Sequence, residues 1–346
     1  MSRRVQTLST AAVLCALLFV LALSLPVSYV ALGPGPADNV LGTDPNSPGT
    51  AIISVPPDKA FPTTGRLLLT TVSVSNTLTL GGALVRWLAS SDAVVPRTIP
   101  YPPQRSVRET EKQDRQDMVD SQDSSTVAAL TLLGVPRVIR VAGFSPGGKA
   151  DGPLRVKDEV MSVDGTPVPT IEGLVAAVSA LPAGSVARLE IRRAGKDIPV
   201  EVPTTSTPDG QGTRTMLGAV FQIGFTVDVA VSLQGVGGPS AGLMYSLGII
   251  DKLTPGPLTG GRVIAGTGSI DATGSVGLIG GIQQKLLAAR REGATVFLVP
   301  GGNCDEAVKA HVGGLQLVRV PADKGLAAAY DDLQRLQRGD TALPAC

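Results

Sequence analysis

The chain has 346 residues, which is enough for about two domains. It carries 30 lysine and arginine residues against 29 aspartate and glutamate residues, and this balance gives no electrostatic footprint for nucleic acid. The single histidine, His311, excludes a two-histidine metal site within the chain, and the three cysteines lack any CxxC or zinc-like spacing.

The N-terminal sequence predicts a membrane-spanning segment over residues 11–32. This stretch, AAVLCALLFVLALSLPVSYVAL, is strongly apolar and lies within a region free of charged residues. As a helix it is long enough to cross a hydrocarbon core about 30 Å thick. A cleaved signal peptide is the alternative, but Tyr29 and Pro34 disfavour the small-residue cleavage sites that follow the apolar run. We therefore expect an uncleaved signal-anchor.

Basic residues before the span predict its orientation. Arg3 and Arg4 place residues 1–10 in the cytoplasm, because positive charge is retained on that side of a membrane. The rest of the chain is then expected outside the cytoplasmic membrane. Residues 33–62 are rich in proline, glycine, asparagine and aspartate, and are expected to form a linker.

The next segments predict a strand and two helices. GRLLLTTVSVS, Gly65–Ser75, is apolar and β-branched, which is typical of a strand. A helix ending near Ala89 is expected after it. Ser106 and Glu109 form a capping-box pattern ahead of a long helix expected over residues 107–133.

From Arg137 onward the pattern changes to short strands around one amphipathic helix, with turns expected at Asp164–Gly165 and Ala194–Gly195. This order, together with VAGFSPGGKADGPLRVKDEVMSVDGTPV, resembles bacterial PDZ domains over about 70 residues, and residues 135–222 are assigned to this domain and its connection. The resemblance implies a groove between a strand and the helix, in which an extended peptide adds as a β-strand. The alternative is a small α/β module that only spaces the neighbouring parts. The residues expected to line the groove are Val138, Val141, Ile171 and Leu174.

The segment that follows carries residues suited to chemistry. Ser240 lies in GGPSAG ahead of an apolar run, Thr267 in AGTG, and Lys285 near the start of a predicted helix. A serine in this position is either a helix N-cap or a nucleophile. Apolar neighbours favour burial of Lys285, and desolvation lowers the pKa of a lysine. A neutral Lys285 can take the proton of Ser240, and Thr267 can hold the amine towards it.

The segments GGPSAG, TGSIDATGSVGLIGGIQQK and GATVFLVPGGN together resemble the proteolytic domain of the Lon proteases, which use a Ser–Lys dyad. The resemblance extends from Val227 to about Pro321. It implies Ser240 as the nucleophile, Lys285 as its base and Thr267 as a supporting residue. Three small residues beside the serine are expected to admit a peptide and to border the oxyanion: Gly238, Ala241 and Gly242.

The sequence also predicts how these parts are connected. No GxxxxGK[ST] motif occurs, so neither an ATPase module nor any cofactor is expected. A Lon-type domain needs strands and a long helix before its serine, and residues 204–225 leave no room for them. We therefore expect an α+β fold with one Lon-like domain split into residues 40–134 and 223–346, and a PDZ domain inserted between the halves. A separate N-terminal domain is the alternative.

The predicted function is that of an ATP-independent serine endopeptidase acting on protein or peptide substrates outside the membrane, as in the membrane-anchored Lon-like proteases of Gram-positive bacteria, which this arrangement resembles. The alternative is a non-catalytic PDZ scaffold carrying a silent Lon-like fold. The resemblance to Lon also allows a homo-oligomer, and no nucleic-acid partner is expected. In an oxidising compartment Cys304 and Cys346 either pair or remain two unpaired thiols.

Overall fold

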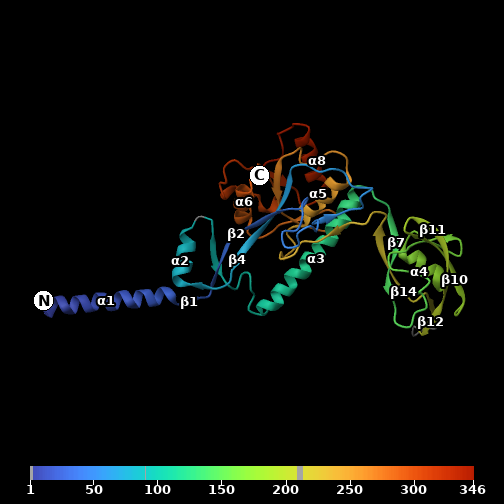
Figure 1. Ribbon diagram of the computed structural model, residues 1–346, viewed down its shortest axis with the longest axis horizontal. Coiled ribbons are helices and arrows are strands. Elements are labelled where there is room, and N and C mark those ends of the chain that lie inside the picture. Colours follow the sequence, from blue (N-terminus) through green and yellow to red (C-terminus); the bar gives the residue numbers. More distant parts are fainter. Residues whose placement is uncertain (1–2, 90, 209–212) are drawn as a thin grey trace. The chain divides into compact units, whose positions relative to one another are not determined.

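Helix α1 (Arg3–Ser24) begins the computed structural model, which describes residues 3–89, 91–208 and 213–346 (Figure 1). Its apolar part, Gln6–Ser24, is long and apolar enough to cross a membrane, a property that membrane anchors and signal sequences share. The predicted span of 11–32 extends past the end of this helix at Ser24. The helix ends earlier because Pro26 lacks a donor and the chain beyond it enters β-strands.

Much of the segment predicted as a linker, residues 33–62, is in fact built into the main sheet or the core. Strand β2 (Tyr29–Asn39) pairs antiparallel with β4 (Arg66–Ser75) on one edge and with β6 (Ala93–Pro96) on the other. The pairing with β4 is interrupted between Pro34 and Ala37, where a bulge accommodates prolines that cannot donate to the ladder. The linker prediction was wrong because a bulged strand shares its composition with a loop.

The main sheet has six strands in the order β20-β19-β16-β4-β2-β6 (Figure 1). Its last three strands in the sequence are β16 (Val263–Gly266), β19 (Val296–Pro300) and β20 (Gln316–Val320). Strand β16 runs parallel to both β4 and β19, and β19 runs parallel to β20. Because β4 precedes residue 134 and β16 follows residue 228, this sheet combines distant parts of the chain.

Two helices cover opposite faces of the sheet. Helix α6 (Ile282–Arg291) packs its apolar residues against Leu68, Ala265 and Phe297. Helix α5 (Gly242–Leu253), which is almost entirely buried, lies on the other face, where Met244 approaches Gly266. Neighbouring residues of a strand point to opposite faces, so Ala265 and Gly266 serve different helices.

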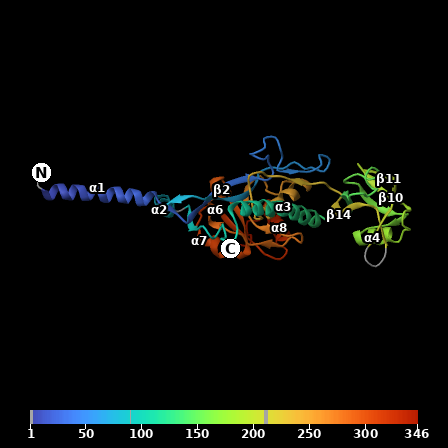
Figure 2. The same cartoon turned by 90° about the horizontal axis from the view of Figure 1, so that it is seen from below.

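The long helix α3 (Val107–Leu132), which is labelled in Figures 1 and 2, packs against α5. It begins with the predicted capping box, in which the Ser106 hydroxyl accepts from the Glu109 N–H and the Glu109 carboxylate accepts from the Ser106 N–H. The remaining elements of this part of the chain are β1 (Pro26–Val27), β3 (Ile53–Ser54), β5 (Leu78–Thr79), α2 (Leu80–Leu88), β15 (Ala230–Val231), β17 (Ser269–Ile270), β18 (Val276–Gly277), a 3-10 turn (Gly301–Asn303), α7 (Cys304–Lys309) and α8 (Gly325–Gln337).

Strand β15 pairs antiparallel with β3. One further expectation is resolved in this part of the fold. Cys304 and Cys346 form a disulfide with 5.0 Å between their Cα atoms, a normal separation for such a bond. The disulfide holds the C-terminal residue against the start of α7.

The chain divides into two compact units, one made of Met1–Leu133 and Val229–Cys346 and the other of Gly134–Asp228. The second unit contains a sheet in the order β11-β10-β8-β7-β14, with β9 paired to β8. Its elements are β7 (Arg137–Phe144), β8 (Glu159–Val163), β9 (Thr166–Pro167), α4 (Ile171–Ser179), β10 (Val186–Arg193), β11 (Lys196–Pro203), β12 (Thr205–Pro208), β13 (Thr213–Met216) and β14 (Ala219–Phe225).

Both predicted turns in this second unit are confirmed. Asp164 and Gly165 have φ values of 47° and 77°, and Ala194 and Gly195 have φ values of 49° and 76°. Two successive positive φ angles are the signature of the type I′ turn, whose twist matches that of the paired strands. Thr170 caps α4, since its hydroxyl accepts from the Gly173 N–H.

The strand expected to border the peptide groove is β7, and the structure shows that it is an interior strand. One edge of β7 pairs with β14 and the other with β8. An added peptide needs an edge with free backbone groups, so Val138 and Val141 were wrongly assigned to the groove. The two end strands of the sheet are β11 and β14, and β14 is the one beside α4.

Candidate active site

The turn that carries Ser240 is held in place by helix α3. The Gly238 N–H donates to the Asp114 carbonyl, and the Ser121 hydroxyl donates to the Pro239 carbonyl, over 2.8 and 3.0 Å. Gly238 has a φ of 84°, which an L side chain rarely adopts, so this position requires glycine. The turn is therefore fixed from a helix that lies more than a hundred residues earlier in the chain.

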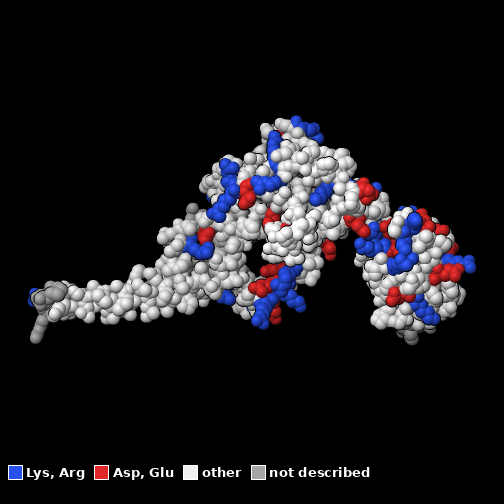
Figure 3. All heavy atoms as spheres, viewed as in Figure 1, with Lys and Arg blue, Asp and Glu red and all other residues white. Residues whose placement is uncertain are grey.

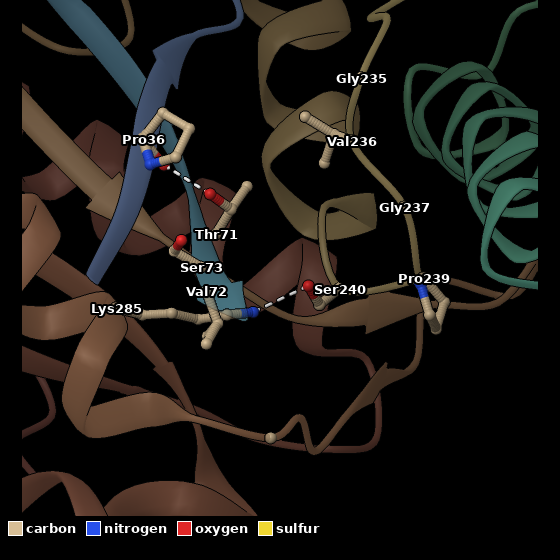
Figure 4. A pocket seen from close by; sticks show the side chains of 11 residues that line it. Pro36, Thr71, Val72, Ser73, Gly235, Val236, Gly237, Pro239, Ser240 and Lys285 are labelled. Atoms are coloured by element: carbon tan, nitrogen blue, oxygen red, sulfur yellow. Dashed lines mark hydrogen bonds between the residues drawn. The ribbon is translucent and has the colours of Figure 1, made fainter. Parts of the chain in front are cut away.

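Ser240 does not cap the helix that follows it. The N-cap of α5 is Ala241, which makes no side-chain capping bond. The Ser240 hydroxyl instead contacts Lys285, with 2.8 Å between Oγ and Nζ (Figure 4). The N-cap interpretation of Ser240 was therefore wrong, and its hydroxyl is left free for another role.

Lys285 reaches the serine from α6. Gly281 is the N-cap of α6, and its left-handed conformation (φ 69°) lets the chain enter the helix. The apolar side of α6 buries Ile282, Leu286 and Ala289. This packing carries Lys285 into the interior, where its side chain is only 3% exposed. Burial without a carboxylate partner disfavours the ammonium form, and it lowers the pKa of Lys285 from 10.5 to about 8.

Thr267 completes a set of three linked side chains at the carboxyl end of β16. Lys285 Nζ donates to Thr267 Oγ1 over 2.9 Å, and the Thr267 hydroxyl donates to the Ser240 carbonyl over 3.0 Å. Because the threonine proton is committed to that carbonyl, its oxygen can only accept from the lysine. One N–H of a neutral Lys285 amine is thereby directed to Thr267, and its lone pair can face Ser240.

A cavity of about 490 Å³ opens beside these side chains (Figure 4). Strands β2 and β4 form one wall and the turn before Ser240 forms the other. The residues that line it are Pro36, Thr71, Val72, Ser73, Gly235, Val236, Gly237, Pro239, Ser240, Gly280 and Lys285. The cavity is bordered by backbone and small side chains, which suits an extended peptide better than a compact ligand. His311, exposed after α7, is not among the lining residues that the structure describes.

The three small residues expected to admit the peptide serve other purposes. Ala241 is buried, and a Cβ on Gly242 would lie 2.7 Å from Ile270 and 3.0 Å from Ser121. Neither residue lines the cavity, and Gly238 is required for its backbone conformation. Their small size therefore serves the packing of α5 and the shape of the turn rather than a passage for substrate.

Sequence reasoning missed two features of the site. Pro36 was placed in a linker, although the bulge in β2 brings it to the cavity. Buried Asn303 was not singled out, although its side chain accepts from the Ile279 N–H and donates to the Ile279 carbonyl, both over 2.9 Å. This pair of bonds fixes the loop that leads into Gly281 and Lys285. The sequence offered one signal, an asparagine that follows the apolar stretch VFLVP and two glycines.

The comparisons with known proteins concern this same region. A family model described as the Lon protease (S16) C-terminal proteolytic domain matches residues 227–313, which include Ser240, Thr267 and Lys285. The matched segment is thus similar to the Lon proteolytic domain, and this likeness supports a serine peptidase.

Individual relatives show the same likeness over short stretches. The Lon-type segment is 48% identical over 63 residues to the Lon protease of Clostridioides difficile (strain 630), covering 18% of this chain and 8% of that protein. It is 34% identical over 96 residues to the peroxisomal Lon protease homolog 2 of Caenorhabditis elegans, covering 28% of this chain and 12% of that protein. The chain thus spans only a small fraction of the length of these relatives.

Solved structures similar to this chain include two PDZ domains of SdrC-like proteins. The one from Listeria monocytogenes is 13% identical with a TM-score of 0.22, covering 24% of this chain and 86% of that structure. The one from Listeria innocua is 15% identical with a TM-score of 0.22, covering 25% of this chain and 93% of that structure.

The second unit has a cavity of its own, between α4 and β14, with a volume of about 250 Å³. It is mostly apolar and borders the end strand of the sheet. Leu174 is among its lining residues and also belongs to the buried core of the unit, while Ile171 packs against that core and is not among the described lining residues. The other lining residues are Val175, Val178, Ser179, Arg214, Thr215, Met216, Leu217, Ala219 and Phe221.

Proposed function

We propose that this protein is a serine endopeptidase in which Ser240 is the nucleophile and Lys285 is the general base. The observation that carries the proposal is the 2.8 Å contact between Ser240 Oγ and Lys285 Nζ at a site where burial lowers the pKa of the lysine. A serine hydroxyl is a weak nucleophile without a base beside it. The match of this segment to the Lon proteolytic domain supports the same assignment.

The proposed reaction passes through an acyl-enzyme. Neutral Lys285 accepts the Ser240 proton while Oγ bonds to the carbonyl carbon of the scissile peptide. The resulting ammonium then gives its proton to the leaving amine as the carbon–nitrogen bond breaks. In the second half, Lys285 takes a proton from water, the hydroxide oxygen attacks the ester, and the proton returns to Ser240. The first turn of α5 supplies positive potential for the tetrahedral oxyanion.

We also propose that residues before the second unit complete the Lon-type domain. Three contacts support this: β4 pairs with β16, α3 holds the Ser240 turn, and β2 with β4 form a wall of the cavity. On this view the domain is split by the insertion of residues 134–228. The 346 residues contain no P-loop motif, which supports action without ATP.

The second unit is proposed to capture substrate as a PDZ domain does, with its groove between α4 and β14. An extended peptide can add to an end strand and place alternate side chains into an apolar trough. The position of the cavity along β14 supports this location. Helix α1 is proposed to remain as the anchor, with Arg3 and Arg4 at its start on the cytoplasmic side and the units outside.

The pH dependence of cleavage tests the proposed chemistry. The full chain, in detergent, should cleave an unfolded protein such as casein in the absence of nucleotide. Below pH 8 the value of kcat/KM should rise about tenfold per pH unit, and it should level above that pH as Lys285 becomes neutral. A midpoint well below pH 8 would contradict Lys285 as the base, and a dependence on ATP would contradict the nucleotide-free proposal.

A substitution in the α4–β14 groove tests peptide capture. Val175→Asp places a carboxylate in the apolar trough, and it should raise KM for a long unfolded substrate about tenfold because the charge must be desolvated. The kcat for a short fluorogenic peptide should not change. Ala176→Asp, on the exposed side of the same helix, is the matched control. Equal KM values for the two variants would argue against capture in this groove.

A further inference from the structure

Helix α2 has its apolar face turned outward. Its sequence is LGGALVRWL, and no residue in it is buried. The residues on the side towards the protein are small or polar: Gly81, Gly82, Ala83 and Arg86. The Arg86 guanidinium pairs with the Asp92 carboxylate over 2.7 Å. The exposed large apolar residues are Leu80, Leu84, Val85, Trp87 and Leu88, and Trp87 is 68% exposed. Leu80, Leu84, Trp87 and Leu88, at positions i, i+4, i+7 and i+8, form one apolar stripe with Val85 beside it. In a soluble helix such a stripe faces the core.

This helix begins where α1 ends. The Leu80 N–H donates to the Leu25 carbonyl over 2.9 Å, one residue beyond the end of α1. The short strands β1 and β5 pair between the two helices, with Pro26 opposite Thr79. A Cβ on Gly81 would lie 3.2 Å from the Leu23 carbonyl, so the α2 backbone touches the last turn of α1. The start of α2 is therefore fixed at the level at which the apolar helix ends.

We infer that α2 lies in the interfacial layer of the lipid bilayer, with its apolar stripe in the boundary between headgroups and acyl chains. This inference rests on the proposal that α1 remains as a membrane anchor. A helix joined to the end of a span reaches that boundary before it reaches water, and tryptophan favours this depth because its ring is apolar and its N–H is polar. On the face that Figure 3 shows, charged side chains are scarce over α1 and the surface beside it.

The alternative occupant of this stripe is a second copy of the chain. The bonds between α2 and the end of α1 favour lipid, since they set the depth of the helix whatever the oligomeric state. With α2 in the interface, the first unit is held against the membrane at two places, the span and the stripe. The Ser240 cavity lies in the same unit. These two attachments therefore limit how far the cavity can move from the bilayer surface.

Trp87 is the only tryptophan in the chain, so its fluorescence reports on α2 directly. The full chain is reconstituted in phosphatidylcholine vesicles, and quenching by acyl chains carrying bromine is compared with quenching by aqueous acrylamide. Brominated lipid should quench the fluorescence of Trp87 strongly. In a Val85→Ser/Leu88→Ser variant this quenching should be about threefold weaker, because the stripe leaves the interface. Val308→Ser, an exposed apolar position on α7, should leave it unchanged.

Two measurements separate the inference from its premise and from its rival. If the protein floats with vesicles and resists alkaline extraction while acrylamide alone quenches Trp87, the anchor stands and the place of α2 is overturned. If alkaline extraction releases the protein, the anchor fails and the inference falls with it. Protection of Trp87 that disappears when the protein is diluted in excess lipid would assign the stripe to a second copy and overturn the inference.

Discussion

Replacing Ser240 with alanine is expected to abolish cleavage, lowering kcat by about 10⁴-fold or more because no other group can form the acyl-enzyme. Lys285→Met should fall to a similar level, since a serine without its base is unreactive at neutral pH. The double variant should be no worse than either single one, because the two residues act as a unit. The measurement is the rate of appearance of new amino termini in an unfolded protein substrate.

Ser232→Ala is the matched control for this loss. Ser232 is exposed, precedes the same turn and does not line the cavity among the residues that the structure describes. Its variant should cleave at the rate of the unaltered chain. Substantial cleavage by Ser240→Ala would remove the serine from the mechanism. If the unaltered chain and all variants were equally inert, the non-catalytic scaffold would be the better account of this fold.

Lys285→Met is also expected to make the protein more stable at pH 7. Burial lowers the pKa of Lys285 from 10.5 to about 8. This difference means that the buried ammonium lowers the free energy of unfolding by roughly 3 kcal/mol. Methionine has a similar length and no charge, so it removes most of that cost while losing the hydrogen bonds to Ser240 and Thr267. We expect the free energy of unfolding to rise by roughly 1–3 kcal/mol, measured by urea denaturation.

The pH dependence of this difference has a definite sign. A lysine whose pKa is lowered in the folded state costs most below pH 8, where both states are protonated, and least above pH 10.5, where neither is. The stability gained by Lys285→Met should therefore be constant below pH 8 and shrink as the pH rises towards 10.5. Lys309→Met, at an exposed position on α7, should change stability by less than about 0.5 kcal/mol. A gain that grows with pH would contradict the origin assigned to it.

These two results would express one property of the site. The apolar packing of α6 that makes Lys285 a usable base also makes the native state less stable. Active sites often retain groups that stability alone would remove, because function requires them. In this protein the cost falls on a single amine, and the hydroxyl groups of Ser240 and Thr267 offset part of it.

The local signals in the sequence were reliable where one short stretch contains all the interacting groups. The capping box of Ser106 and Glu109 and the positive-φ turn at Ala194–Gly195 each depend on neighbours within a few residues. The apolar N-terminal helix was recognised for the same reason, although its end was placed too late. Composition failed in β2, because Pro34 and Pro36 suggest a loop until the bulge that tolerates them is seen.

The sequence by itself determined which residues of this protein can do chemistry, because Ser240, Thr267 and Lys285 are the right types at a consistent spacing. Only the tertiary structure decided that they meet, that an apolar cavity lies between α4 and β14, and that the stripe on α2 faces outward. The physical reason is that contact, strand pairing and burial depend on which distant segment packs beside each residue. A residue type and its neighbours in the chain state what is possible, and packing selects among those possibilities.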